Sequence, residues 1–139
     1  MLAGSAFGHT SPAEVYSPLV GLDLVATGPA RISLPLTASF EHAALVLSGA
    51  ASIEDEQLTP DTLLYLGSSR ERVAVSCEAA ARIILVGGAP FGEDILLWWN
   101  FVARDAQEME RAARDWNTGQ RFGAVNGSPS PRLTAPARS

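Results

Sequence analysis

The sequence predicts an all-β fold, an antiparallel sandwich or barrel with one C-terminal helix. Two observations lead to this fold class. Short apolar runs recur about every ten residues with Gly, Pro and Asp between them, which is typical of antiparallel sandwiches and barrels. No amphipathic pattern of helix length lies between these runs before residue 104, which argues against a parallel βαβ sheet.

The individual runs are strand candidates because they alternate apolar with small or polar residues, or are short and continuously apolar. They cover residues 20–24, 32–36, 43–47, 50–53, 62–66, 73–77, 83–86 and 95–99. Pro35 indicates an edge strand or a strand end. The charged residues 54–57 are a turn, although their carboxylates could also serve acid–base chemistry.

A helix is predicted over about residues 105–118. Asp105 can act as its N-cap, with Glu108 completing a reciprocal capping arrangement. An apolar stripe follows at spacings of three and four, and Gly119 is a natural end. Residues 1–18 are predicted to be an extended N-terminal segment, 19–123 the barrel with its helix, and 124–139 a disordered tail with three prolines.

Composition restricts the partners and the compartment. The chain has 10 Arg, no Lys and 15 acidic residues, a net charge of −5, which argues against nucleic acid and anionic membranes as partners. The single cysteine, Cys77, excludes an internal disulfide and a cysteine-based zinc site. No apolar run reaches the ~20 residues of a membrane span, and the N-terminus lacks signal-peptide character, so a cytoplasmic location is expected.

Three further stretches form a specific combination. Residues 84–92 read ILVGGAPFG, residues 98–102 read WWNFV, and residues 119–123 read GQRFG after the predicted helix. Together with the runs at 45–49 and 58–67, they resemble the C-terminal cupin half of pirin-family proteins, over about residues 2–123. The resemblance implies that the fold is a single antiparallel β-barrel of cupin type, similar to a jelly roll, with one C-terminal helix. Pirins are two-cupin proteins whose N-terminal barrel holds iron, and some act as quercetin dioxygenases; the resemblance does not extend to that half.

The cupin resemblance allows a test for metal ligands. A cupin site uses two histidines one residue apart, a glutamate and a later histidine, which face the ion from alternating strand positions. The glutamate position falls here at His42, the paired histidine positions fall near 35–38, and the later histidine falls near Arg72. Arginine has no lone pair to offer and residues 35–38 hold no ligand, so no metal and no cofactor are predicted.

Five residues are candidates for binding. His42 and Arg72 could form a polar pocket for a small acidic ligand through the arginine fork; alternatively, they are a histidine at a strand start and a solvated arginine. Trp98, Trp99 and Trp116 could lie at an interface, where tryptophan is enriched; alternatively, they are packing residues.

The function predicted first is a metal-free, pirin-like single cupin domain that is not an enzyme and acts through protein contacts. Its partner would be a second copy in a homodimer, or a second cupin domain. One alternative is a cupin that binds a small acidic or aromatic molecule near His42 and Arg72. Another alternative is a dioxygenase of quercetinase type in which two subunits together supply the metal-coordinating residues, such as His9 and His42.

Overall fold

The computed structural model describes residues 1–124, 127 and 129–137. The chain divides into two compact units, residues 1–90 and residues 91–139, and each has its own hydrophobic core. The boundary between them lies inside the predicted 19–123 segment. Within the described ranges, no helix is long and apolar enough to cross a membrane.

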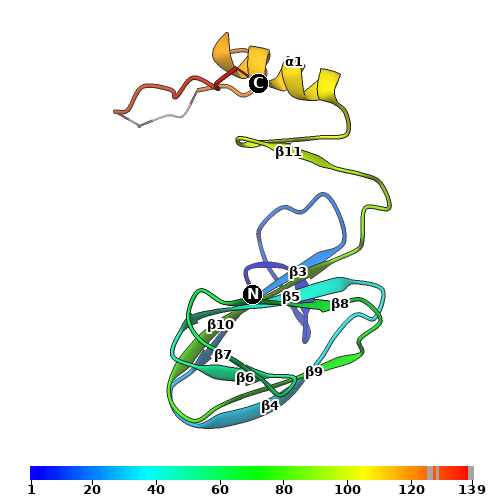
Figure 1. The fold of residues 1–139 in the computed structure, drawn as a ribbon, viewed down its shortest axis with the longest axis vertical. Helices are drawn as coiled ribbons and strands as arrows, with labels where there is room; N and C mark the ends of the chain where they lie inside the picture. Colours follow the sequence, from blue (N-terminus) through cyan, green and yellow to red (C-terminus); the bar gives the residue numbers. More distant parts are fainter. Residues whose placement is uncertain (125–126, 128, 138–139) are drawn as a thin grey trace. The chain divides into compact units, whose positions relative to one another are not determined.

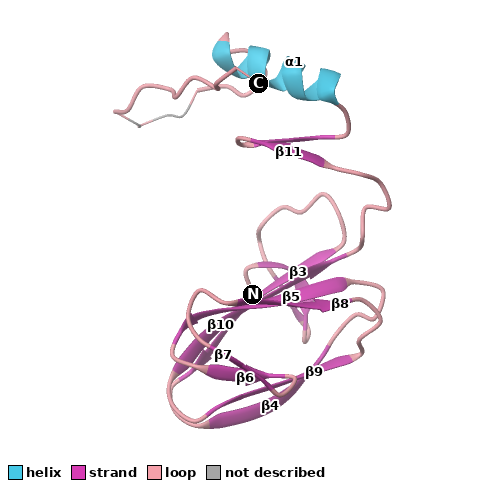
Figure 2. Cartoon of the chain, viewed as in Figure 1, coloured by secondary structure: helices cyan, strands magenta, loops and turns pink. Residues whose placement is uncertain are grey.

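Residues 1–90 form ten antiparallel strands in two facing sheets (Figures 1 and 2). One sheet has the order β2-β1-β3-β10-β5-β8 and the other the order β4-β9-β6-β7. Among these strands the two sheets do not join into one closed barrel, so the unit is a two-layered jelly-roll arrangement. The predicted all-β antiparallel fold class with one helix is confirmed. The strand bounds are β1 Ala3–Ala6, β2 His9–Thr10, β3 Leu19–Ala26, β4 Ala30–Pro35, β5 Glu41–Ser48, β6 Ala51–Ile53, β7 Glu56–Leu58, β8 Leu63–Gly67, β9 Arg72–Cys77 and β10 Ala81–Gly88.

The core of this unit lies between the two sheets, because alternate side chains of each long strand point inward. Strand β5 buries its second, fourth and sixth residues, β9 does the same, and β10 buries its first, third and fifth. Cys77 is one of these inward residues, buried as expected for a small apolar side chain. In β5 the inward set is His42, Ala44 and Val46, so an imidazole occupies a core position.

The N-terminal residues are part of the larger sheet. Strand β1 pairs with both β2 and β3. Gly4 allows the close approach of β1 to β3: its φ is +68°, and a Cβ there would lie 1.8 Å from the Leu19 carbonyl oxygen. This pairing brings residues 5–7 to the end of the two-sheet core.

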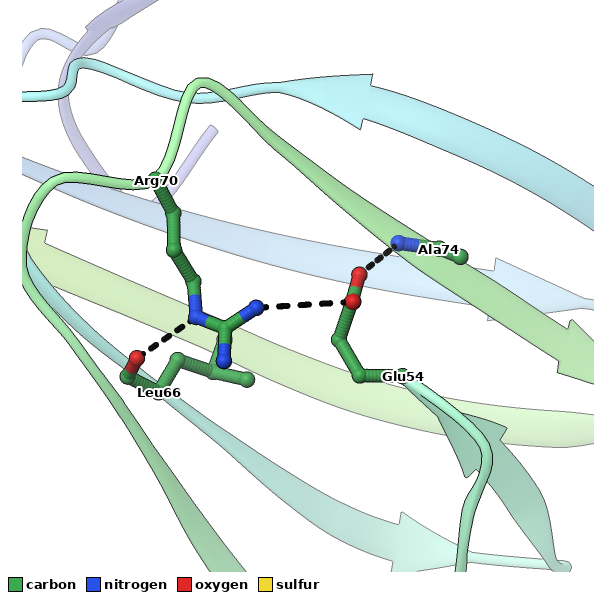
Figure 3. A network of polar contacts seen from close by, with 4 residues as sticks. All are labelled: Glu54, Leu66, Arg70 and Ala74. Atoms are coloured by element: carbon green, nitrogen blue, oxygen red, sulfur yellow. Dashed lines mark hydrogen bonds and ion pairs between the residues drawn. The ribbon is translucent and has the colours of Figure 1, made fainter.

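The turn between β6 and β7 is held against β9 by Glu54 (Figure 3). Its Oε1 accepts a 2.6 Å hydrogen bond from the Ala74 amide, and its Oε2 lies 3.4 Å from Arg70 Nη1. Arg70 Nε also donates to the Leu66 carbonyl at 2.7 Å. Glu54 and Asp55 have φ values of 49° and 68°, as a two-residue hairpin turn of type I′ requires. This carboxylate therefore has a structural role.

The second unit consists of a hairpin and the helix. Strands β11 (Leu96–Trp98) and β12 (Phe101–Ala103) pair, and α1 follows over Ala106–Asn117. The Asp105 carboxylate accepts a 2.7 Å hydrogen bond from the Glu108 backbone amide. The Glu108 carboxylate in turn accepts a 3.2 Å hydrogen bond from the Arg104 backbone amide. Alternate hairpin residues pack with the buried helix residues Met109 and Ala112.

Part of the 124–139 segment contacts the helix. The side-chain amide of Asn117 makes two hydrogen bonds to the backbone of Ala135: its oxygen accepts from the Ala135 amide at 2.8 Å, and its nitrogen donates to the Ala135 carbonyl at 3.2 Å. Trp116 Nε1 donates to the Leu133 carbonyl at 2.7 Å. Residues 125, 126, 128, 138 and 139 of the predicted disordered tail lie outside the described residues.

Candidate functional site

A cavity of about 210 Å³ opens at one end of the two-sheet unit. Its walls come from both sheets: residues 5–7 at the end of β1, Val20 and Leu22 on β3, residues 35–37 at the end of β4, His42 on β5 and Leu85 on β10. All of these residues belong to the first unit. The wall is mostly apolar, and His42 is its only titratable side chain.

His42 is buried in the wall of this cavity. Its side chain is 1% exposed, and neither Nδ1 nor Nε2 has a hydrogen-bond partner among the described residues. Its ring lies beside that of Phe40, with 6.1 Å between the centroids. A buried polar atom without a partner is costly and uncommon in native proteins, so this imidazole stands out as a functional candidate.

Gly87 provides the space that the imidazole occupies. It is the partner of His42 in the pairing of β10 with β5. A Cβ at this position would lie 2.4 Å from His42 Cδ2 and 2.9 Å from Nε2, so any side chain would collide with the ring. In the sequence, Gly87 and Gly88 are notable only as part of a family motif. The role of Gly87 in making room for the His42 ring becomes visible only from the cross-strand register of β10 with β5.

Burial lowers the pKa of His42 below its usual value, because an imidazolium in this position would lose its hydration. The backbone of Phe40 has a smaller effect in the opposite direction and raises the pKa. The cavity wall carries no carboxylate that could stabilise a positive charge. The ring is therefore neutral at neutral pH, with one donor nitrogen and one acceptor nitrogen.

The structure does not bring Arg72 to His42. Arg72 is exposed, and it donates from Nε to Ser33 Oγ at 3.0 Å and from Nη2 to the Ser33 carbonyl at 3.4 Å. Residues 35–37, by contrast, do line the cavity with His42. The segment near which the cupin pattern places the paired histidines therefore lies at the same cavity as His42, and it holds Pro35, Leu36 and Thr37.

The side chains around the cavity do not fit an iron ion. A cupin-type iron site needs several imidazole and carboxylate ligands, whereas the wall offers one imidazole and the hydroxyls of Ser5 and Thr37. No group of three or more His, Cys, Asp or Glu side chains in the described part of the chain is arranged to hold a metal. No step through a metal follows from these residues.

The three tryptophans pack together in the second unit. Trp99 lies 5.6 Å from Trp116 and 5.3 Å from Phe101, and Trp98 lies 6.2 Å from Phe101, between ring centroids. Trp99 stands in the hairpin turn with φ of 51° and not on the strand, so strand alternation does not send it to the face opposite Trp98. The interface role of the three rings stays a prediction.

The opposite face of this hairpin carries other apolar side chains. Leu97 and Val102 are directly paired across the strands and are 77% and 63% exposed. Val102 also lines a groove of about 170 Å³ with Phe91 and Ile95. We call Phe91, Ile95, Leu97 and Val102 the outer hairpin face. Its rim is charged, with a 2.9 Å ion pair between Arg104 Nε and Glu93 Oε1 and with Glu108 nearby.

Comparison with known proteins shows the family. Residues 21–123 match the family model described as the pirin C-terminal cupin domain. A Pseudomonas aeruginosa protein provisionally named quercetin 2,3-dioxygenase is 39% identical over 137 residues, which cover 98% of this chain and 44% of that protein. A pirin-like protein of Caulobacter vibrioides is 28% identical over 120 residues, 86% of this chain and 41% of that protein.

A solved structure agrees with these matches. The crystal structure of quercetin 2,3-dioxygenase from Acinetobacter baumannii has a TM-score of 0.86 at 36% identity, over 99% of this chain and 46% of that one. This chain therefore spans less than half the length of the relatives it matches. The resemblance that the motifs indicated is confirmed, and the chain belongs to the pirin family, within which it corresponds to the C-terminal cupin domain.

Proposed function

We propose that this chain is a non-catalytic cupin domain that acts by associating with a second copy of itself. The observation that carries the proposal is the outer hairpin face, an exposed apolar surface with a charged rim. An apolar centre surrounded by charged and polar groups is the usual anatomy of a protein interface.

The hairpin cannot cover this face by itself. Its inner side chains, Leu96, Trp98, Phe101 and Ala103, already pack in the cluster with the helix. Because side chains alternate along a strand, Leu97 and Val102 must point the other way. In the described part of the second unit they remain exposed, and covering them would remove apolar surface from water.

A second copy of the chain presents the same exposed apolar face, with Leu97 and Val102 at its centre. In an isologous dimer the same patch is used on both subunits.

The test is the mass of the protein in solution, measured by light scattering and sedimentation equilibrium up to about 200 µM, where even a weak interface is populated. We expect a dimer, and we expect Leu97→Glu combined with Val102→Glu to convert it to a monomer. Val25→Glu is the matched control, because Val25 is also apolar, 66% exposed and on a strand, but belongs to the other unit. A monomeric parent protein, or a dimer that survives the double substitution, would refute the proposal.

The reaction named for the relatives is the competing assignment. If two subunits shared the metal ligands, His42 of one copy would have to approach His9 of another. His42 is only 1% exposed, which makes such a contact between copies unfavourable. Elemental analysis of the same purified sample distinguishes the two. Near-stoichiometric iron, nickel or zinc would favour catalysis, and metal-free dimer would favour the association role.

A further inference from the structure

We propose that the last turn of α1 and the hairpin form a binding site for an extended segment of a partner protein in which an arginine is followed, three residues later, by an alanine. In the structure the chain's own residues 132–135, Arg-Leu-Thr-Ala, occupy this site, and we call them the docked segment. The inference goes beyond the association proposed above and does not depend on it, because the docked segment packs with the inner hairpin side chains and not with the outer hairpin face.

The site binds the backbone of the docked segment. Asn117 uses both ends of its side-chain amide: Oδ1 accepts from the Ala135 amide at 2.8 Å, and Nδ2 donates to the Ala135 carbonyl at 3.2 Å. Trp116 Nε1 donates to the Leu133 carbonyl at 2.7 Å. Hydrogen bonds to the main chain are a general source of affinity for extended peptides, and they do not depend on the side chains of the segment.

The arginine is recognised by its charge and its planar shape. The guanidinium carbon of Arg132 lies 4.6 Å from the centroid of the Trp116 ring, within the range of a cation–π interaction. Its Nη1 donates to the Trp116 carbonyl at 2.9 Å, and its Nη2 donates to the Gly123 carbonyl. Carbonyl groups at the C-terminal end of a helix carry partial negative charge, so this end of α1 favours a cation.

The position three residues after the arginine accepts a small apolar side chain. Ala135 is 4% exposed and belongs to the core of the second unit. Its partners there are Phe101, Ala103, Met109 and Ala112. A larger side chain would have to displace packed residues. Leu133, in contrast, is 74% exposed, so the identity of the residues between the arginine and the alanine matters little.

The docked segment is suited to act as a ligand that a partner displaces. Pro131 and Pro136 flank it directly, and proline restricts the residue before it to extended conformations. Because the segment belongs to the same chain, its local concentration at the site is on the order of millimolar. A partner segment with a Kd well below this concentration would take its place, and the docked segment is then an intramolecular competitor.

The test empties the site in the full chain and adds the segment back as a separate peptide. Arg132→Ala combined with Ala135→Glu removes both anchors and keeps Trp116 and Asn117. The chain has three tryptophans, so the indole N–H signal of Trp116 can be assigned and followed by NMR. We expect the capped peptide PRLTAPA, which corresponds to residues 131–137, to return this signal saturably to its position in the parent protein.

Altered peptides test the two anchors. Replacing the arginine of the peptide by alanine should weaken binding at least about tenfold, because hydrogen bonds from a charged group are lost. Replacing its alanine at the position of Ala135 by glutamate should abolish binding, since the position is enclosed. The matched control is alanine in place of leucine at the position of Leu133, which should change the affinity by less than about twofold because that side chain makes no enclosed contact.

Substitutions in the protein locate the site. Asn117→Ala, added to the emptied variant, should weaken peptide binding at least about tenfold by removing two hydrogen bonds. Gln107→Ala is the control, because Gln107 is an exposed amide near the other end of α1. If the emptied variant does not fold, the unlabelled peptide at about 10 mM should displace the docked segment of the labelled parent protein, seen as a shift of the Ala135 amide signal.

Three results would overturn the inference. The first is no effect of the peptide up to about 10 mM, either on Trp116 in the emptied variant or on Ala135 in the parent protein. The second is equal affinity for the unchanged peptide and the peptide without arginine. The third is restoration of the Trp116 signal of the labelled, emptied variant by unlabelled parent protein, which would make the site a contact for exchange of this segment between copies.

Discussion

Replacing Gly87 by alanine tests whether this position exists to accommodate the His42 ring. The new methyl carbon would lie 2.4 Å from His42 Cδ2 and 2.9 Å from the Glu41 carbonyl oxygen. Non-bonded carbons are favourably separated by about 3.5–4.0 Å, so the ring must retreat by about 1 Å. Overpacking of this kind costs about 1–3 kcal/mol. Alanine returns about 0.4–1 kcal/mol by restricting the unfolded chain, so we expect a net loss of about 1–2 kcal/mol.

The assay is a double-mutant cycle followed by urea denaturation. In a His42→Ala background the collision with the ring is gone, so Gly87→Ala should cost at least about 1 kcal/mol less than in the parent protein. Gly88→Ala is the control, because its nearest neighbour would be the Pro18 carbonyl oxygen at 3.3 Å and His42 is not among its neighbours. Additivity of Gly87→Ala and His42→Ala within about 0.5 kcal/mol would refute the reasoning.

Three other predictions concern single groups. The pKa of His42 is lowered in the folded state, so the free energy of unfolding should decrease as the pH falls below about 6.5, by at most about 1.4 kcal/mol per pH unit. Urea denaturation at several pH values measures this dependence, and a His42→Phe variant with the same pH dependence would contradict the prediction. Asp105→Ala should cost about 1 kcal/mol by removing the N-cap, whereas Asp105→Asn should cost little; thermal unfolding followed by circular dichroism measures both. Asp55→Gly should stabilise by about 0.5–1 kcal/mol, because Asp55 has a φ of 68°; a lower urea midpoint would contradict it.

Local pattern predicts the long strands because their buried residues alternate. Strands β5, β9 and β10 each bury every second side chain, and the sequence runs at 43–47, 73–77 and 83–86 mark them. Strands β1, β2, β7 and β12 have two to four residues, too few for a period to be visible. The pairing of β1 with β3 depends on a close contact at Gly4, which no local pattern reveals.

Trp99 shows how tertiary packing overrides a local rule. A bulky residue is rarely found at positive φ, so the run at 95–99 indicates one strand that continues through Trp99. The structure instead ends β11 at Trp98 and turns at Trp99. The contacts of Trp99 with Phe101 and Trp116, at 5.3 and 5.6 Å between centroids, compensate for that backbone conformation.

The candidate site was predictable only in part. The cupin family spacing identified His42, and strand alternation with Ala44 and Val46 gives its inward direction. Arg72 was matched to it by family spacing alone, and its side chain instead bonds Ser33. The wall residues 5–7 come from a segment whose sequence shows no strand pattern, so the cavity becomes visible only when the two sheets are assembled.

The combination of His42 and Gly87 is poorly suited to packing alone. An unpaired buried imidazole costs about 1–3 kcal/mol, and glycine inside a strand costs about 0.5–1 kcal/mol relative to alanine. Both costs fall on one cross-strand pair of a domain whose total stability is about 5–15 kcal/mol. An apolar residue at 42 opposite alanine at 87 would avoid them and fill the cavity.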